Sequence, residues 1–189
     1  GVQARMQLRA IAVARKLSWA LVYDPVPEVV EGFVNALRDL DLEITVAESP
    51  ESLLKQADIL CTATSSGTPL FDGSRVRPGT HINGIGSHAP TARELDTTIV
   101  RRSKFVADSK DACLSEAGDL MIPIDEGTIT ADHVHAELGE LVLGRKPGRE
   151  SDDEITLFKS VGLAIQDVAT AKLVHDKAVE AGIGTTVEL

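Results

Sequence analysis

The chain has 189 residues, which is enough for one domain with a sizeable hydrophobic core. Hydrophobic residues make up 43% and charged residues 25%, which is typical of a soluble globular protein, and the sequence has no apolar run near the ~20 residues that a membrane span needs. The formal net charge of −10 argues against nucleic acid or an anionic membrane as a partner.

Cysteine and histidine usage argues against two further kinds of site. Cys61 and Cys113 each stand in an apolar or helical context, which predicts buried free thiols in a reducing compartment and hence a cytoplasmic protein. The five histidines and the acidic residues form no HExxH or CxxC pattern. We therefore expect no metal site.

The first third of the chain alternates helical and extended segments. Its periodicity and turn residues predict helices over residues 3–16, 28–38 and 50–56, and strands over 18–23, 42–46 and 57–62. The last of these strands, ADILCT, is apolar throughout, as expected of a strand buried in a parallel sheet. This alternation predicts an α/β doubly wound fold, with a mostly parallel Rossmann-type sheet and helices on both of its faces.

The remainder of the chain mixes short strands, loops and helices. We expect strands over residues 81–86, 104–107 and 155–158, and helices over 91–102, 110–116, within 131–144 and over 161–180. Gly118 should stop the helix before it, with Glu116 and Asp119 closing that turn, and residues 121–130 should be irregular. The last helix is therefore expected to be the longest.

The first residues match half of a dinucleotide-binding turn. In the pattern G-x-G-x-x-G/A, Gly1 and Ala4 fit the second glycine and the final small position. Asp24 follows a strand at about the distance of the acid that binds the ribose in such folds. The first strand and the first glycine of the pattern would lie before residue 1. Without them, a GxxA at a helix start equally fits close helix packing.

Four longer stretches resemble the ornithine cyclodeaminase/mu-crystallin family of NAD(P)-dependent enzymes. They are GVQAR at 1–5, TATSS at 62–66, PGTHINGIGSHAPTARELD at 78–96 and FKSVGLAIQDVATAKLVHDKA at 158–178. The resemblance covers essentially the whole chain in unbroken order. It implies that residues 1–189 form a Rossmann-like dinucleotide-binding domain without its first strand and without the family's N-terminal region.

In this family, the N-terminal region holds the substrate carboxylate and forms the dimer. The resemblance therefore implies a homodimer when the protein is complete, acting on a small amino or imino acid. We expect residues 1–189 alone to be inactive. They should also be poorly stable, because strands next to a missing one would be left with open edges.

The resemblance assigns the pyrophosphate and one ribose of the cofactor to the start of the chain. The backbone amides of Val2 and Gln3, after the close approach allowed by Gly1, would point at the pyrophosphate from a helix start. Asp24 would accept both ribose hydroxyls, which favours NAD over NADP because a carboxylate repels a 2′-phosphate. The structural alternatives are tight helix packing at Gly1 and a turn before Pro25 at Asp24.

The nicotinamide half of the cofactor is assigned to later strand ends. The residues that match the family here are Thr62, Thr64, Ile82, Asn83, Gly84, Ile85 and Ser160. Gly84 and Gly86 would let the backbone approach a flat ring. The alternatives are a plain strand residue at Thr62, a plain strand end at 82–86 and an N-cap of the last helix at Ser160.

His88 is the candidate catalytic residue. Ornithine cyclodeaminases have an aspartate at the matching place, whereas this chain reads GSHAP. An imidazole titrates near neutrality and can exchange a proton with an amine or ketimine nitrogen, but it lacks the fixed negative charge that would hold a second substrate ammonium. A histidine that merely orders its own loop is the alternative.

Together these features predict an NAD-dependent enzyme acting on the C–N bond of an amino or imino acid by hydride transfer. Deaminating cyclisation, ketimine reduction and amino-acid dehydrogenation all stay open. The rival from another class is a mu-crystallin-like protein that binds a nucleotide or small ligand without turnover. Steady NADH consumption with a cyclic ketimine would separate the two.

Overall fold

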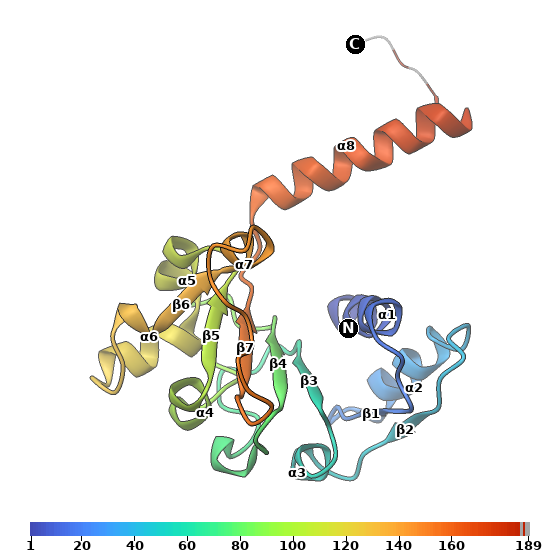
Figure 1. The fold of residues 1–189 in the computed structure, drawn as a ribbon. Helices are drawn as coiled ribbons and strands as arrows, with labels where there is room; N and C mark the ends of the chain where they lie inside the picture. The colour runs from blue at the N-terminus through green and yellow to red at the C-terminus, as the bar shows by residue number, and fades with distance from the viewer. Residues whose placement is uncertain (186, 188–189) are drawn as a thin grey trace.

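The computed structural model describes residues 1–185 and 187, and Figure 1 shows the arrangement of its elements. The helices are α1 (Val2–Ala14), α2 (Pro27–Asn35), α3 (Pro50–Leu54), α4 (Thr97–Arg102), α5 (Lys110–Glu116), α6 (Gly118–Asp125), α7 (Leu138–Val142) and α8 (Ala164–Ala181), with single 3-10 turns η1 (Gly73–Arg75) and η2 (Ala131–His133). The strands are β1 (Ala20–Val22), β2 (Ile44–Val46), β3 (Ile59–Thr62), β4 (His81–Gly84), β5 (Lys104–Ala107), β6 (Val134–Glu137) and β7 (Thr156–Lys159).

Every strand pairing is parallel, as the alternation of helices and strands predicted. The strands form two sheets in the described part of the chain. One has five strands in the order β3-β4-β7-β5-β6, and the other consists of β1 and β2. The α/β architecture is therefore confirmed, while the continuous sheet expected of a doubly wound fold is divided between β1 and β3.

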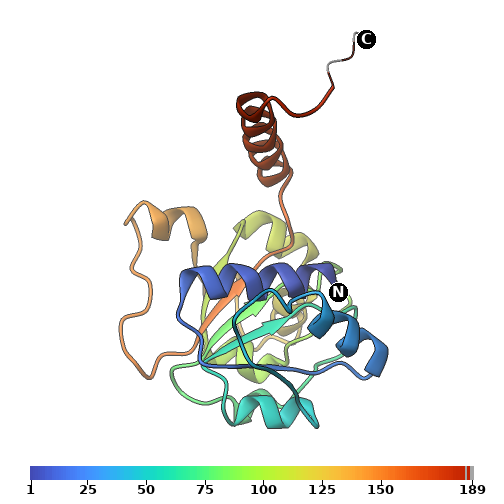
Figure 2. The same cartoon turned by 90° about the vertical axis from the view of Figure 1, so that its right-hand side faces the viewer.

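One face of the five-stranded sheet is closed by a hydrophobic core. Alternate residues along its strands, such as Ile82, Leu157 and Phe105, are fully buried. Helices α4, α5 and α6 cover this face with residues of the same core cluster, which runs from Leu54 to Leu157. Helix α1 lies across the opposite face, next to β3 (Figure 2).

The helix expected over residues 91–102 begins later, at Thr97. Asp96 caps it by accepting a hydrogen bond from the Ile99 amide at 2.8 Å. The preceding amides of Glu94 and Leu95 donate to the Asp119 side chain instead of joining a helix. The prediction was wrong here because the partner of those amides lies far along the chain.

Two further predictions in this region were wrong. Gly118 begins α6 rather than stopping a helix, and α6 occupies part of the segment expected to be irregular. A side chain at Gly118 would collide with the backbone carbonyls of Ala89 and Ala92, so the glycine permits close packing. Residues 131–144 contain strand β6 as well as helix α7, because alternate residues of Val134–Glu137 face the core.

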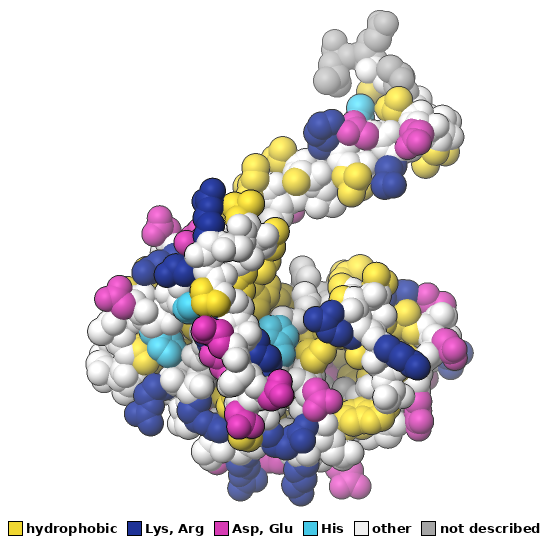
Figure 3. All heavy atoms as spheres, viewed as in Figure 1, with side chains coloured by type: hydrophobic (Ala, Val, Ile, Leu, Met, Phe, Trp, Pro, Cys, Tyr) yellow, Lys and Arg dark blue, Asp and Glu magenta, His cyan; other side chains and the backbone are white. Residues whose placement is uncertain are grey.

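Helix α8 stands clear of the body of the molecule and confirms the long helix expected near the end of the sequence (Figure 1). Apolar side chains lie along it in Figure 3, and its exposed large hydrophobic residues are Ile165, Val168, Leu173, Val174 and Val179. Among the helices of residues 1–185 and 187, none combines the length and the apolar character needed to cross a bilayer.

The two cysteines differ in their surroundings. Cys113 is fully buried, as expected, and this burial raises the pKa of its thiol to about 12. Cys61 lies on β3 and is exposed, so the expectation of a buried thiol was wrong for this residue. The physical reason is that Cys61 alternates along β3 with the buried Leu60 and Thr62, so its side chain lies on the other face of the sheet, where it lines the cavity beside α1.

Candidate active site at the carboxyl edge of the sheet

Parallel strands bring the functional candidates to one edge of the sheet. The register aligns the last residues of β3, β4, β7 and β5 in one row, formed by Thr62, Gly84, Lys159 and Ala107. The loops that follow these residues carry Thr64, Ile85, His88 and Ser160. Open α/β sheets bind their ligands outside such an edge.

A cavity of about 560 Å³ lies between α1, β1 and β3. Gly1, Asp24 and Thr64, three of the residues expected to bind the cofactor, line it together. Asp24 Oδ1 accepts a hydrogen bond from the Val26 amide at 3.0 Å. Most of the remaining lining is apolar and comes from residues such as Leu8 and Phe33, so much of the cavity resembles an unfilled part of the core.

The start of α1 is free to meet an anion. Val2 and Gln3 are exposed, and within the described residues the helix has neither a side-chain cap nor an acidic residue in its first turn. A side chain at Gly1 would meet open space. The first amides of a helix attract negative charge through the helix dipole, and here they lie beside the cavity that Gly1 lines.

Several candidates expected to contact the nicotinamide direct their side chains elsewhere. Ile82 is fully buried in the core. Asn83 donates to Gln7 of α1 at 3.2 Å and contacts the ring of His81 at 3.0 Å. Thr62 is also buried, and its Oγ1 has no hydrogen-bond partner in the described part of the chain. Contacts from these strand residues to a ligand would have to use backbone atoms.

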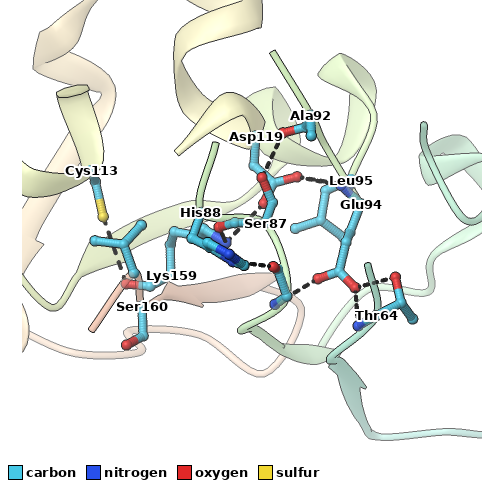
Figure 4. A network of polar contacts seen from close by, with 12 residues as sticks. Thr64, Ser87, His88, Ala92, Glu94, Leu95, Cys113, Asp119, Lys159 and Ser160 are labelled. Carbon is cyan, nitrogen blue, oxygen red and sulfur yellow. Dashed lines mark hydrogen bonds and ion pairs between the residues drawn. The ribbon is translucent and has the colours of Figure 1, made fainter. Parts of the chain in front are cut away.

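A buried carboxylate joins the loops after β3 and β4. Glu94 is fully buried, and its Oε1 accepts hydrogen bonds from the Thr64 amide at 2.6 Å and the Thr64 hydroxyl at 2.7 Å (Figure 4). Its Oε2 accepts from the Gly86 amide at 2.8 Å. A side chain at Gly86 would collide with this carboxylate and with the Thr64 carbonyl. The sequence did not indicate this role of Glu94, because no local sequence pattern distinguishes a buried acidic residue from an exposed one.

A buried ion pair lies next to Glu94. Lys159 Nζ and Asp119 Oδ2 are 3.0 Å apart, and both side chains are fully buried. Lys159 also donates to the Ser87 carbonyl at 2.6 Å (Figure 4). Asp119 Oδ1 accepts from the Glu94 and Leu95 amides at 2.8 and 2.9 Å. Asp119 is thus structural, as expected, but it organises a polar network rather than closing a turn. A lysine inside the apolar strand β7 is the sequence signal that could have indicated a buried ion pair.

Ser160 has a different role from the helix cap considered from the sequence. Its hydroxyl donates to Asp108 Oδ2 at 2.8 Å, and the same oxygen accepts from the amides of Val161 and Gly162, each at 3.0 Å. Helix α8 starts after Leu163, so Ser160 is not its cap. Asp108, which sequence reasoning missed, therefore fixes the turn between β7 and α8 at the carboxyl edge.

His88 is exposed and lies just beyond β4, at the same edge. Its Nδ1 is 2.9 Å from the Gly86 carbonyl oxygen. A carbonyl only accepts, so Nδ1 carries the proton in this contact and Nε2 of the neutral ring has its lone pair free. The ring therefore has one nitrogen fixed by its loop and one available for proton exchange.

Comparison with known proteins identifies the family. The sequence profile of the ornithine cyclodeaminase/mu-crystallin family matches residues 1–182. The chain belongs to the ornithine cyclodeaminase/mu-crystallin family. Within the described residues of this family member, we find no group of three or more histidine, cysteine or acidic side chains suited to a metal ion.

The relatives within the ornithine cyclodeaminase/mu-crystallin family include reductases and a dehydrogenase. The chain is 38% identical over 190 residues to a Delta(1)-pyrroline-2-carboxylate reductase of Bacillus thuringiensis subsp. konkukian, and the match covers 100% of this chain and 58% of that protein. The Thermococcus litoralis Delta(1)-pyrroline-2-carboxylate reductase, solved with NADH and L-proline, is 49% identical, with a TM-score of 0.95 over 99% of this chain and 58% of the other.

An archaeal alanine dehydrogenase dimer with bound NAD is 35% identical to the chain, with a TM-score of 0.91. That match covers 100% of this chain and 58% of the dehydrogenase. The chain thus spans 58% of the length of each of these relatives. These family members share a fold and differ in the substrates that their names state.

Proposed function

We propose that the chain is the cofactor-binding part of an NAD-dependent reductase that acts on the C=N bond of a small cyclic imino acid. The observation that carries the proposal is that Gly1, Asp24 and Thr64 line one cavity, and that Asp24 and Thr64 follow their strands at the carboxyl end, as His88 follows β4. The pyrroline-2-carboxylate reductases among the relatives support the imino-acid substrate.

The residues around α1 fit a dinucleotide. The exposed first turn, with Val2 and Gln3 after Gly1, offers amides to a pyrophosphate. Asp24 Oδ2 is the carboxylate oxygen left for ribose hydroxyls, since Oδ1 accepts from Val26. Bound NADH would supply the hydride that reduces the imine carbon. The negative charge of Asp24 favours NAD over NADP.

The remaining predicted contacts are proposed at backbone level, except for the contact of the Ser160 hydroxyl. Thr62 and Thr64 would face the nicotinamide ribose, and the backbone of Ile82, Asn83, Gly84 and Ile85 would line the ring. The Ser160 hydroxyl already donates to Asp108, so its oxygen keeps a lone pair for the carboxamide N–H groups. This division of roles agrees with the burial of the Ile82 and Thr62 side chains.

His88 would exchange the proton that accompanies the hydride. Reduction of an imine adds a hydride to carbon and leaves the nitrogen to be protonated. In its charged form, with Nδ1–H held by the Gly86 carbonyl, His88 would donate the Nε2 proton to this nitrogen and return to the neutral Nδ1–H ring, which solvent would reprotonate. A cyclodeaminase needs a charge to hold a second substrate ammonium, which an imidazole does not provide. The chain therefore favours reduction, with dehydrogenation as its reverse.

We also propose that the cavity between β1 and β3 receives one more strand, from a segment outside these 189 residues. In the described part of the chain, β1 pairs with β2 alone and β3 with β4 alone, so the two strands present open edges to the cavity. A strand there would join the two sheets into one. The apolar lining and the greater length of the relatives support this.

Amide hydrogen exchange tests the added strand. In residues 1–189 alone, the amides of β1 should exchange much faster than those of β7, because local opening is cheap where few contacts are buried. In the full-length protein the two should become comparable. Equal protection in the 189-residue chain would contradict the proposal.

We propose that the complete protein is a cytoplasmic homodimer. The exposed apolar side chains of α8 and the dimeric alanine dehydrogenase support the assembly. Light scattering of the full-length protein measures it directly.

Turnover decides the main proposal. The full-length protein should oxidise NADH steadily with Delta(1)-pyrroline-2-carboxylate. His88→Asn should lower kcat by roughly 10²–10⁴-fold, the range for general acid–base catalysis. It should leave the Kd for NADH unchanged. His175→Asn, at an exposed position on α8, is the matched control. Binding of NADH and ketimine without turnover would instead indicate a ligand-binding protein, and unchanged turnover in His88→Asn would remove its catalytic role.

A further inference from the structure

Four polar groups of Gly86 and Ser87, in the loop that carries His88, form hydrogen bonds. The Gly86 amide donates to Glu94 at 2.8 Å, and the Gly86 carbonyl contacts His88 Nδ1 at 2.9 Å. The Ser87 hydroxyl donates to the Ala92 carbonyl at 2.5 Å. The Ser87 carbonyl accepts from Lys159 Nζ at 2.6 Å (Figure 4). Two of these bonds join the backbone of the loop to the buried side chains of Glu94 and Lys159, so the backbone before His88 is fixed to the interior.

Lys159 is a costly way to hold a loop. Its side chain and that of Asp119 are both fully buried, and removing two charges from water costs several kcal/mol per ion before their attraction offsets it. Apolar residues of similar size often serve stability as well or better. The ion pair is therefore poorly explained by stability, and its distinctive feature is the ammonium aimed at the Ser87 carbonyl.

We propose that Lys159 is a positioning residue that acts through Ser87 to set the orientation of the His88 ring. This proposal rests on the proposed catalytic role of His88. The Ser87 carbonyl belongs to the peptide unit that continues into His88, so the Lys159 bond fixes the plane of that peptide. The adjacent Gly86 carbonyl then accepts Nδ1–H from the exposed ring, which leaves Nε2 as the free nitrogen.

Asp119 holds the Lys159 side chain in place. Its Oδ2 balances the ammonium at 3.0 Å, while its Oδ1 accepts the amides of Glu94 and Leu95. The same backbone segment carries the Glu94 side chain, which bonds Gly86 and Thr64. Through this network, the His88 loop and the Thr64 loop are fixed to one buried frame.

The test uses Lys159→Met in the full-length protein, because methionine keeps the apolar stem and removes the ammonium. We expect kcat to fall about 10–100-fold, as for a small misplacement of a catalytic group, with the KM for NADH unchanged. In a His88→Asn background, the same substitution should change kcat by less than about 2-fold, because coupled residues are not additive. Nitrogen NMR of His88 should change from the Nδ1–H tautomer to a mixture of tautomers.

Lys104→Met is the matched control. Lys104 lies at the opposite end of the neighbouring strand β5 and pairs with Glu150 and Glu154 at 2.6 and 2.8 Å. Lys104→Met should leave both kcat and the His88 tautomer unchanged. If Lys159→Met does not fold, Lys159→Met/Asp119→Asn removes both charges and keeps an acceptor for the Glu94 amide, and the same readouts apply.

Two results would overturn the positioning role: a His88 tautomer unchanged in the Lys159 variant, or a fall in kcat that persists in full in the His88→Asn background. The tautomer measurement needs no turnover. Unchanged turnover in His88→Asn would instead disprove the catalytic role of His88 in the proposed function. Failure of the positioning role and failure of the proposed function therefore give different results.

Discussion

The five-stranded sheet is packed more tightly than the N-terminal layer, which consists of α1, β1, α2 and β2. In the sheet, Ile82, Phe105 and Leu157 are fully buried and belong to one core cluster. In the N-terminal layer, every residue of α1 and β1 is exposed or half-buried, and the cavity beside them is lined by apolar side chains. The core cluster begins at Leu54, beyond this layer.

This difference separates stability from cofactor binding. The sheet holds the buried network under His88, whereas Gly1 and Asp24 belong to the loosely packed layer. A strand inserted between β1 and β3 would therefore both complete the core and steady the residues proposed to bind the cofactor. Three predictions test the contrast, from the largest expected effect to the smallest.

Phe105→Ala and Phe33→Ala remove the same side chain from the two regions. Phe105 is fully buried in the sheet core, so its truncation should lower the free energy of unfolding by about 3–5 kcal/mol. Phe33 borders the cavity, and its truncation should cost less, because part of its contacts is already missing. Urea denaturation followed by circular dichroism measures both.

The same pair of variants sharpens the proposal of an added strand. In the full-length protein, the cost of Phe33→Ala should rise toward that of Phe105→Ala, because a strand would fill the cavity. Equal costs in residues 1–189 alone would break the contrast between the regions.

Asp24→Ala tests whether cofactor binding belongs to the N-terminal layer. In the full-length protein it should weaken NADH binding by about 1.5–3 kcal/mol for each lost charged hydrogen bond, while the urea midpoint changes little. Isothermal calorimetry measures the affinity. Asp41→Ala, at an exposed position after α2, is the control. Tighter binding of NADPH than NADH by the unmodified protein would contradict the role of Asp24.

The pH dependence of stability at His81 tests whether the face of the sheet beside α1 disfavours a charged side chain. Burial lowers the pKa of His81 below 6.5, and the nearby Arg149 and Arg15 lower it further. The folded state therefore binds fewer protons than the unfolded state, so this contribution to stability is present above about pH 6.5 and is lost as the pH falls through 6.5 toward the folded-state pKa. His81→Gln should reduce this loss.

Urea midpoints from about pH 7.5 downward measure the effect, with His175→Gln on α8 as the control. Carboxylates such as Glu126, whose pKa is lowered by the Thr97 hydroxyl and by Arg93, lose their contribution below 4.5 and so fall in a separate window. An identical pH dependence in the protein with and without His81 would show that this face does not disfavour the charged ring.

The sequence by itself determined the elements whose signals are local. The alternation of apolar strands and helices predicted the parallel α/β fold, and the pattern KFVA predicted β5 with its observed bounds. The spacing of Gly1 and Asp24 anticipated two residues that line one cavity. Hydrophobic periodicity and turn-forming residues are properties of short stretches of sequence, and so they can be recognised without knowledge of the fold.

The tertiary structure alone decided what lies beneath the candidate active site. The late start of α4, the strand β6 and the network of Glu94, Asp119 and Lys159 each depend on partners distant in sequence. A buried charge is stable only beside its partner, and no local pattern tells which residues will meet. The sequence could nominate His88 but not the tautomer of its ring, because the Gly86 carbonyl accepts from Nδ1 only in the loop conformation held by Glu94 and the distant Lys159.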